Sequence, residues 1–171
     1  MRFLPPDAVI PGLDVEGLRA YLRTQPDVIA AYLFGSHAAG RPRPGSDIDI
    51  ALLLEQPPAA EDDIDAALAR FDRRMDLEMA MERFVQGKPL DLVILNRSPI
   101  LLQFQVLYNG LLLYEGDREK RVDFEVRTVK QYYDWKVIHD RMTEALLQDI
   151  REGRFGERKR HHQRALAHVD G

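Results

Sequence analysis

The pair Gly35-Ser36, followed after ten residues by Asp47-Ile48-Asp49, is the feature that most constrains this chain. The apolar run from Val28 to Phe34 that precedes it has the length and composition of a buried strand, and it stops at the glycine. A Gly-Ser turn after such a strand can lead into a helix N-terminus, whose free N–H groups favour an anion such as phosphate. We therefore expect Gly35 and Ser36 to bind the phosphates of a nucleotide.

Asp47 and Asp49 introduce a second apolar run, which continues to Leu54 and is predicted to be a strand. Alternate residues of a strand face the same way, so the two carboxylates project together. Strand preference disfavours aspartate, and two neighbouring carboxylates repel each other unless a cation lies between them. The spacing therefore predicts a divalent-metal site rather than an ordinary turn with two surface aspartates.

A third carboxylate, Asp91, interrupts another short apolar run between Leu90 and Leu95. If this predicted strand lies beside the strand of Asp47 and Asp49, Asp91 completes a cluster of three acids. Mg²⁺ usually takes one or two protein carboxylates together with water and phosphate oxygens, so three acids can hold two ions. Asp47, Asp49 and Asp91 are therefore the candidate catalytic and metal-binding residues, with two Mg²⁺ ions as the expected cofactor.

Gly-Ser, ten residues and Asp-x-Asp together resemble the signature of the minimal nucleotidyltransferase family, in the DNA polymerase β-like superfamily, over about residues 15–115. The resemblance implies an α/β (α+β) fold, with a small mixed sheet flanked by helices and, here, a long C-terminal helix. It also implies nucleotidyl transfer from a nucleoside triphosphate to a hydroxyl. By position, Gly35 and Ser36 would bind the triphosphate, and Asp47 and Asp49 both metals. Asp91 would bind the catalytic metal and help to deprotonate the acceptor.

The sequence departs from this family between the two halves of the motif. Many relatives carry arginine at the positions of His37 and Ala39, whereas here the positive charges are Arg41 and Arg43. The departure concerns the affinity for the triphosphate and not the metal site.

The segment from Arg118 to about Glu152 is predicted to form one long helix. Its apolar residues cover more than one side, which favours packing both on its own domain and on a partner, with packing on its own domain alone as the alternative. The segment beyond Gly153 is basic and weakly patterned, as flexible ends usually are. We therefore divide the chain into a nucleotidyltransferase domain (1–116), a partner-binding helical extension (117–152) and a basic flexible tail (153–171).

Within the extension, the run from Phe124 to Trp135 resembles the nucleotidyltransferase antitoxins that are encoded beside HEPN-type ribonuclease toxins. The resemblance implies an antitoxin that binds its toxin and transfers AMP from ATP to a toxin tyrosine. Two other functions stay open. One is a non-enzymatic antitoxin that neutralises its partner by contact. The other is a transferase for a small molecule such as an aminoglycoside, although about 55 residues beyond Gly116 are few for the second domain that it needs.

Composition narrows the remaining possibilities. The chain has no cysteine, so neither disulfides nor thiolate chemistry contribute. No run approaches twenty apolar residues and no signal peptide is recognisable, so we expect a cytoplasmic protein that binds no membrane. The net charge is −4, and residues 1–116 hold 11 basic against 17 acidic side chains. This balance does not suggest direct nucleic-acid binding.

Apolar residues at near-helical spacing predict a further long helix over about residues 59–84. We expect this stripe to face the core, and Met75, Met79 and Met81 to fill it. The stripe consists of Ile64, Leu68, Phe71, Met75, Met79 and Phe84.

Overall fold

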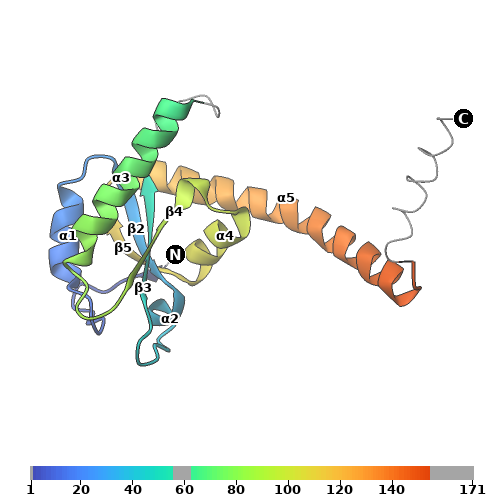
Figure 1. The fold of residues 1–171 in the computed structure, drawn as a ribbon, viewed down its shortest axis with the longest axis horizontal. Coiled ribbons are helices and arrows are strands. Elements are labelled where there is room, and N and C mark those ends of the chain that lie inside the picture. Colours follow the sequence, from blue (N-terminus) through green and yellow to red (C-terminus); the bar gives the residue numbers. More distant parts are fainter. Residues whose placement is uncertain (1, 56–62, 155–171) are drawn as a thin grey trace, which may run out of the picture. The chain divides into compact units, whose positions relative to one another are not determined.

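The structure, a computed structural model, describes residues 2–55 and 63–154. Five strands form one mixed sheet in the order β1-β5-β2-β3-β4, with helices on both faces (Figure 1). This architecture confirms the predicted small mixed sheet flanked by helices. The elements are β1 (Arg2–Phe3), α1 (Val15–Arg23), β2 (Val28–Phe34), α2 (Gly35–Ala38), β3 (Ile48–Leu54), α3 (Ile64–Glu82), β4 (Leu90–Ile94), a 3₁₀ turn (Leu95–Arg97), α4 (Ile100–Asn109), β5 (Leu111–Glu115) and α5 (Arg118–Arg151).

The sheet brings the segments of the sequence motif side by side. Strand β2 runs antiparallel to both of its neighbours, β3 and β5. Strand β4 lies parallel to β3 at the edge of the sheet, and Asp91 is paired in register with Asp49. The condition on which Asp91 joins the other two aspartates, that β3 and β4 are neighbours, is therefore met.

Each face of the sheet carries its own core. Helices α1 and α3 cover one face, where Leu18 and Leu22 of α1 are fully buried among side chains of β2 and β3. Helix α4 and the first turns of α5 cover the other face, with Val106 and Phe124 against Tyr32. Strands β2 and β3 lie between these layers, and for this reason the sequence shows them as continuous apolar runs.

The structure corrects the predicted inner face of α3. Most of its apolar stripe is exposed, and only Phe84, just beyond the helix, packs against the core. Leu77 and Met81 face the sheet instead, so Met81 fills the core as predicted, whereas Met75 and Met79 do not. The exposed stripe residues are Ile64, Leu68, Phe71, Met75 and Met79.

Arg73 ties α3 down in this orientation. Its Nε and Nη2 donate hydrogen bonds of 2.8 and 2.6 Å to the two carboxylate oxygens of Asp27, in the turn before β2. This bidentate pair holds the pKa of Asp27 below its usual range. The pair lies on the same side of the helix as Leu77, so both contacts favour the same rotation of α3.

Helix α5 begins in one compact unit of the chain, Met1–Val129, and continues into a second, Lys130–Gly171. In the first unit, the buried Arg121 donates to Glu115 at 2.6 Å and to Glu125 at 2.5 Å. The hydroxyl of Tyr32 also donates to Glu125, at 3.3 Å, and burial raises the pKa of this tyrosine. These contacts fix the start of α5 against the sheet.

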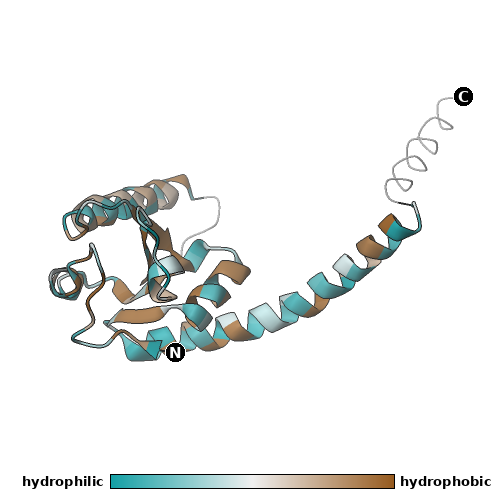
Figure 2. Cartoon of the chain, turned by 90° about the horizontal axis from the view of Figure 1, so that it is seen from below, coloured by the Kyte–Doolittle hydropathy of each residue, from teal (hydrophilic) through white to brown (hydrophobic). Residues whose placement is uncertain are grey.

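Further along α5, many apolar side chains are exposed, and Figure 2 colours them brown among hydrophilic neighbours. Most of the predicted tail (153–171) lies outside the described residues, as do residues 59–62 of the helix predicted over 59–84. Within residues 2–55 and 63–154, no helix combines the length and apolar character that a membrane crossing requires.

Candidate active site

The Gly-Ser turn lies directly against one of the predicted carboxylates. Strand β2 ends at Phe34, and Gly35 begins the single-turn helix α2 with a φ of +66°. A Cβ atom at this position would lie 2.1 Å from Oδ2 of Asp49. Only glycine therefore fits here, because a side chain would both strain the backbone and displace the carboxylate.

The backbone of Ser36 lies beside the carboxylate of Asp49 and acts to lower the pKa of that group. This contact was not foreseen from the sequence, which predicted Ser36 as a phosphate ligand only. The contact links the Gly-Ser turn to the Asp-x-Asp strand.

The three aspartates differ in burial and influence one another. Asp49 is half-buried, whereas Asp47 and Asp91 are exposed. Burial is the largest cause that raises the pKa of Asp49, followed by the negative charges of Asp91 and Asp47. The backbone of Ser36 acts in the opposite direction. The structure thus brings the three predicted carboxylates within electrostatic range of one another.

The carboxylates do not converge on a common point. Among the described residues, no group of three or more His, Asp or Glu side chains is close enough to hold a metal ion in this conformation. Carboxylates repel one another until a cation neutralises their charge. For this reason the three aspartates can influence one another's charge without meeting at one point. The set of hard oxygen donors that these aspartates offer fits Mg²⁺. Their role as metal ligands stays a prediction.

The positive charge beside the Gly-Ser turn comes from a lysine that the sequence did not single out. Nζ of Lys88, in the loop before β4, lies 3.2 Å from Nε2 of the buried His37. An ammonium group can only donate, so Nε2 accepts and the ring proton lies on Nδ1. That Nδ1 is buried with no hydrogen-bond partner among the described residues. Arg41 and Arg43, the charges singled out in the sequence, are exposed.

The side chain of Lys88 passes close over the backbone of Gly12, where a Cβ would lie 2.8 Å from Cδ of the lysine. The small residue at position 12 therefore gives the lysine its route to His37. The sequence offers one signal for this arrangement, the turn Gly87-Lys88-Pro89 before a predicted active-site strand.

This fold and this motif define a nucleotidyltransferase. The family model "Polymerase beta, Nucleotidyltransferase" matches residues 16–119, and the chain belongs to this family. No curated protein matches the sequence at a significant level.

Several solved structures have a similar chain fold. A chain of a toxin–antitoxin crystal structure with AMP-PNP has a TM-score of 0.58 and 26% identity, with 79% of this chain and 99% of that chain covered. A chain of the toxin–antitoxin pair MntA–HepT has a TM-score of 0.52 and 24% identity, covering 78% and 96%.

A third neighbour comes from the complex of a tri-AMPylated Shewanella oneidensis HEPN toxin with its MNT antitoxin. It has a TM-score of 0.51 and 22% identity, covering 78% of this chain and 98% of that chain. At these identities the second and third likenesses concern the fold alone.

Proposed function

We propose that this protein is a Mg²⁺-dependent antitoxin that transfers AMP from ATP to a tyrosine hydroxyl of a partner HEPN toxin. The observation that carries the proposal is the contact between the two halves of the motif, in which Gly35 and Ser36 lie against Asp49, itself in register with Asp91. The nucleotide donor agrees with the AMP-PNP in a neighbouring toxin–antitoxin structure. The protein acceptor is taken from the resemblance of the α5 segment and from the AMPylated toxin of another neighbour.

The carboxylates of Asp47, Asp49 and Asp91 would hold Mg²⁺, which lowers the pKa of an attacking hydroxyl and neutralises the leaving pyrophosphate. The Gly-Ser turn, with Lys88 beside it, orients the triphosphate. Asp91, exposed on the edge strand, accepts the phenolic proton as the tyrosine oxygen bonds to the α-phosphorus. The bond from that phosphorus to the bridging oxygen breaks, and pyrophosphate leaves.

Helix α5 supplies the surface for the toxin in this proposal. Its exposed apolar side chains continue well beyond the part that is fixed to the sheet by Arg121, and water-exposed apolar surface of this extent favours a protein partner. They include Val122, Val126, Val129, Val137, Ile138, Met142, Leu146, Leu147 and Ile150.

Replacing Met142 and Leu146 together by aspartate is expected to weaken toxin binding at least about a hundredfold. The two side chains lie one helical turn apart and are 68% and 45% exposed, so their loss should leave the thermal unfolding of the free protein unchanged. Burial of each side chain at an interface contributes about 1.5–3 kcal/mol, which corresponds to this factor. Calorimetric titration of each variant with the toxin measures the dissociation constant. Val9→Asp is the matched control, because Val9 is 86% exposed and lies outside α5. Equal binding by both variants would contradict the assigned surface.

The activity itself is tested by intact mass spectrometry. The purified protein is incubated with Mg²⁺, each nucleoside triphosphate in turn and a candidate HEPN toxin from the same genome. We expect AMP-sized additions to the toxin with ATP only, and none with Asp47→Asn. A tight complex without additions would favour neutralisation by contact, and modification of an aminoglycoside instead of the toxin would favour the small-molecule transferase.

A further inference from the structure

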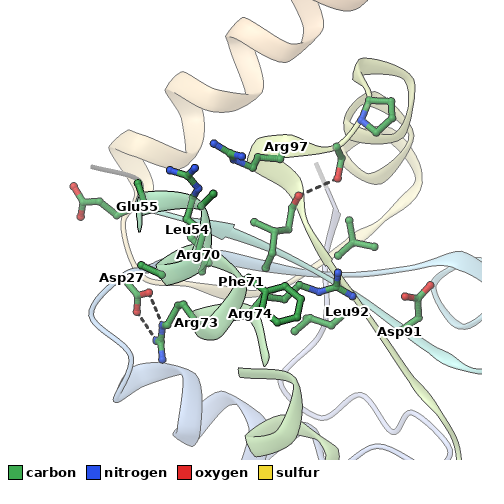
Figure 3. A pocket seen from close by; sticks show the side chains of 17 residues that line it. Asp27, Leu54, Glu55, Arg70, Phe71, Arg73, Arg74, Asp91, Leu92 and Arg97 are labelled. Carbon is green, nitrogen blue, oxygen red and sulfur yellow. Dashed lines mark hydrogen bonds and ion pairs between the residues drawn. The ribbon is translucent and has the colours of Figure 1, made fainter. Parts of the chain in front are cut away.

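A cavity of about 750 Å³ lies between α3 and the edge strand β4, and no part of the nucleotide-binding motif apart from Asp91 lines it. Figure 3 shows Asp91 at one end of the cavity and the Asp27–Arg73 pair at the other. Leu54, Leu92 and Ile94 contribute apolar walls from the sheet. The cavity therefore extends from the predicted catalytic base, on the edge strand, towards the turn before β2.

The cavity exists because the side chains on the inner side of α3 change along the helix. In the second half of the helix, Leu77 and Met81 fill the space above the sheet. Along the same side, one to three turns earlier, the residues are Ala66, Arg70 and Arg73, which line the cavity instead of closing it. Alanines and guanidinium groups thus stand where apolar side chains would have completed the core.

Arg70 lacks a partner that its burial requires. Its Nε and Nη2 are buried, and neither has a hydrogen-bond partner among the described residues. Two carboxylates of the lining are already engaged, Asp27 by Arg73 and Glu55 by Lys120. A buried guanidinium without a partner is costly, and two parallel N–H donors match a carboxylate. The geometry favours a ligand with an apolar body and an acidic group.

The direction of the strands shows from which side this ligand approaches. The Gly-Ser turn at the end of β2 lies at the same end of the sheet as Asp49 and Asp91, near the starts of β3 and β4. The cavity extends from Asp91 towards the opposite end of these strands, where Leu54 and Ile94 line it. Strand β4 also has no paired strand on its outer edge among the described residues, and such an edge can hydrogen-bond to an extended peptide.

We propose that this cavity binds the acceptor segment of the protein substrate, an extended stretch that carries an acidic side chain beside the tyrosine. The acidic group pairs with Arg70 on the α3 face, and the segment passes over the open edge of β4, where the tyrosine hydroxyl reaches Asp91. This assignment rests on the proposed function for the role of the segment, but not for its binding. The basic segment 154–164 of the chain itself is a poor occupant, because its charges would repel Arg70, Arg74 and Arg97 in the lining.

The test is nuclear magnetic resonance titration of the ¹⁵N-labelled full chain, without nucleotide, with a synthetic peptide that has one tyrosine flanked by aspartate and glutamate. We expect amide shifts in β4 and the first half of α3. Arg70→Met should weaken binding about tenfold or more, since it removes a charged hydrogen-bond pair. Ala67→Phe, which narrows the cavity without changing charge, should weaken it as well. Arg23→Met is the matched control, because Arg23 is exposed and outside the lining.

A second peptide with lysines in place of the acids should bind at least about tenfold more weakly. Equal affinity for both peptides, or an unchanged affinity in Arg70→Met, would overturn the assignment. Weaker binding of AMP-PNP by Arg70→Met would also overturn it, because the cavity would then hold the nucleotide. Peptide binding in the cavity together with no AMP transfer to any toxin would keep the binding site and refute the proposed function. AMP transfer to a toxin, without changes in the β4 amide signals on addition of the peptide, would support the proposed function and refute the binding site.

Discussion

Asp49→Asn is expected to reduce AMP transfer at least about a thousandfold while the protein keeps its fold. The carboxylate lies at the centre of the proposed site, in contact with the Gly-Ser turn and between the charges of Asp47 and Asp91. An amide of nearly the same shape preserves the packing beside the Gly-Ser turn but cannot balance the charge of a divalent ion, and electrostatic losses of this kind have effects of that size. Steady-state transfer to the toxin, with the fold checked by circular dichroism, measures the result.

The same substitution is expected to leave the melting temperature at pH 7 unchanged or up to about 2 °C higher. The folded-state pKa of Asp49 is raised, so the ionised carboxylate is a destabilising group above that pKa, and its cost disappears as the pH falls through it. The difference between variant and wild type should therefore shrink from pH 7 towards pH 3. A melting temperature that falls sharply on Asp49→Asn at pH 7 would contradict this account of the site.

Gly35→Ala is expected to destabilise the protein clearly more than Gly40→Ala, although both glycines have a φ of +66°. An L-residue in this backbone conformation costs about 1–2 kcal/mol at either position. At Gly40 the added Cβ would meet nothing within 4 Å, whereas at Gly35 it would collide with Asp49. The collision should add about 1–3 kcal/mol, in the range of other overpacking substitutions.

Urea unfolding measures the free energy of unfolding of both variants. The backbone strain is the same in the two, so the difference between their values reports the collision with Asp49 alone. We also expect Gly35→Ala to lose most of its transfer activity, since the added Cβ would displace the carboxylate of Asp49 from its place beside the Gly-Ser turn. Gly40→Ala should stay within about threefold of wild type. Equal unfolding free energies for the two variants would show that the contact between Gly35 and Asp49 does not constrain the site.

Residue type and spacing alone predicted most of the elements. The runs Val28–Phe34 and Ile48–Leu54 are apolar along their whole length because both faces of β2 and β3 are covered, and this pattern is visible without coordinates. Asp14 caps α1, where its side chain accepts a 2.9 Å hydrogen bond from the N–H of Gly17. One charge within a short apolar run indicated Asp91 as a candidate, and the structure places it in register with Asp49.

A candidate active site could be predicted for a related reason. Gly-Ser and Asp-x-Asp are local features whose residue types are unfavourable in ordinary strands and turns, so their presence indicates a chemical role. The sequence did not show which basic residue lies beside the Gly-Ser turn. Lys88 reaches His37 across 51 positions of sequence, by a route that depends on Gly12.

The rotation of α3 was decided by the tertiary structure alone. A period of 3.6 residues determines which side chains share a face but not which face turns inward. The stripe from Ile64 to Met79 was the more apolar face, yet Leu77, Met81 and the Asp27–Arg73 pair hold the opposite face against the sheet. These contacts join residues far apart in the chain, and they leave Arg70 facing a cavity. The sequence by itself thus determined the strands, the turn and the three acids, whereas long-range packing determined the surface on which a substrate can bind.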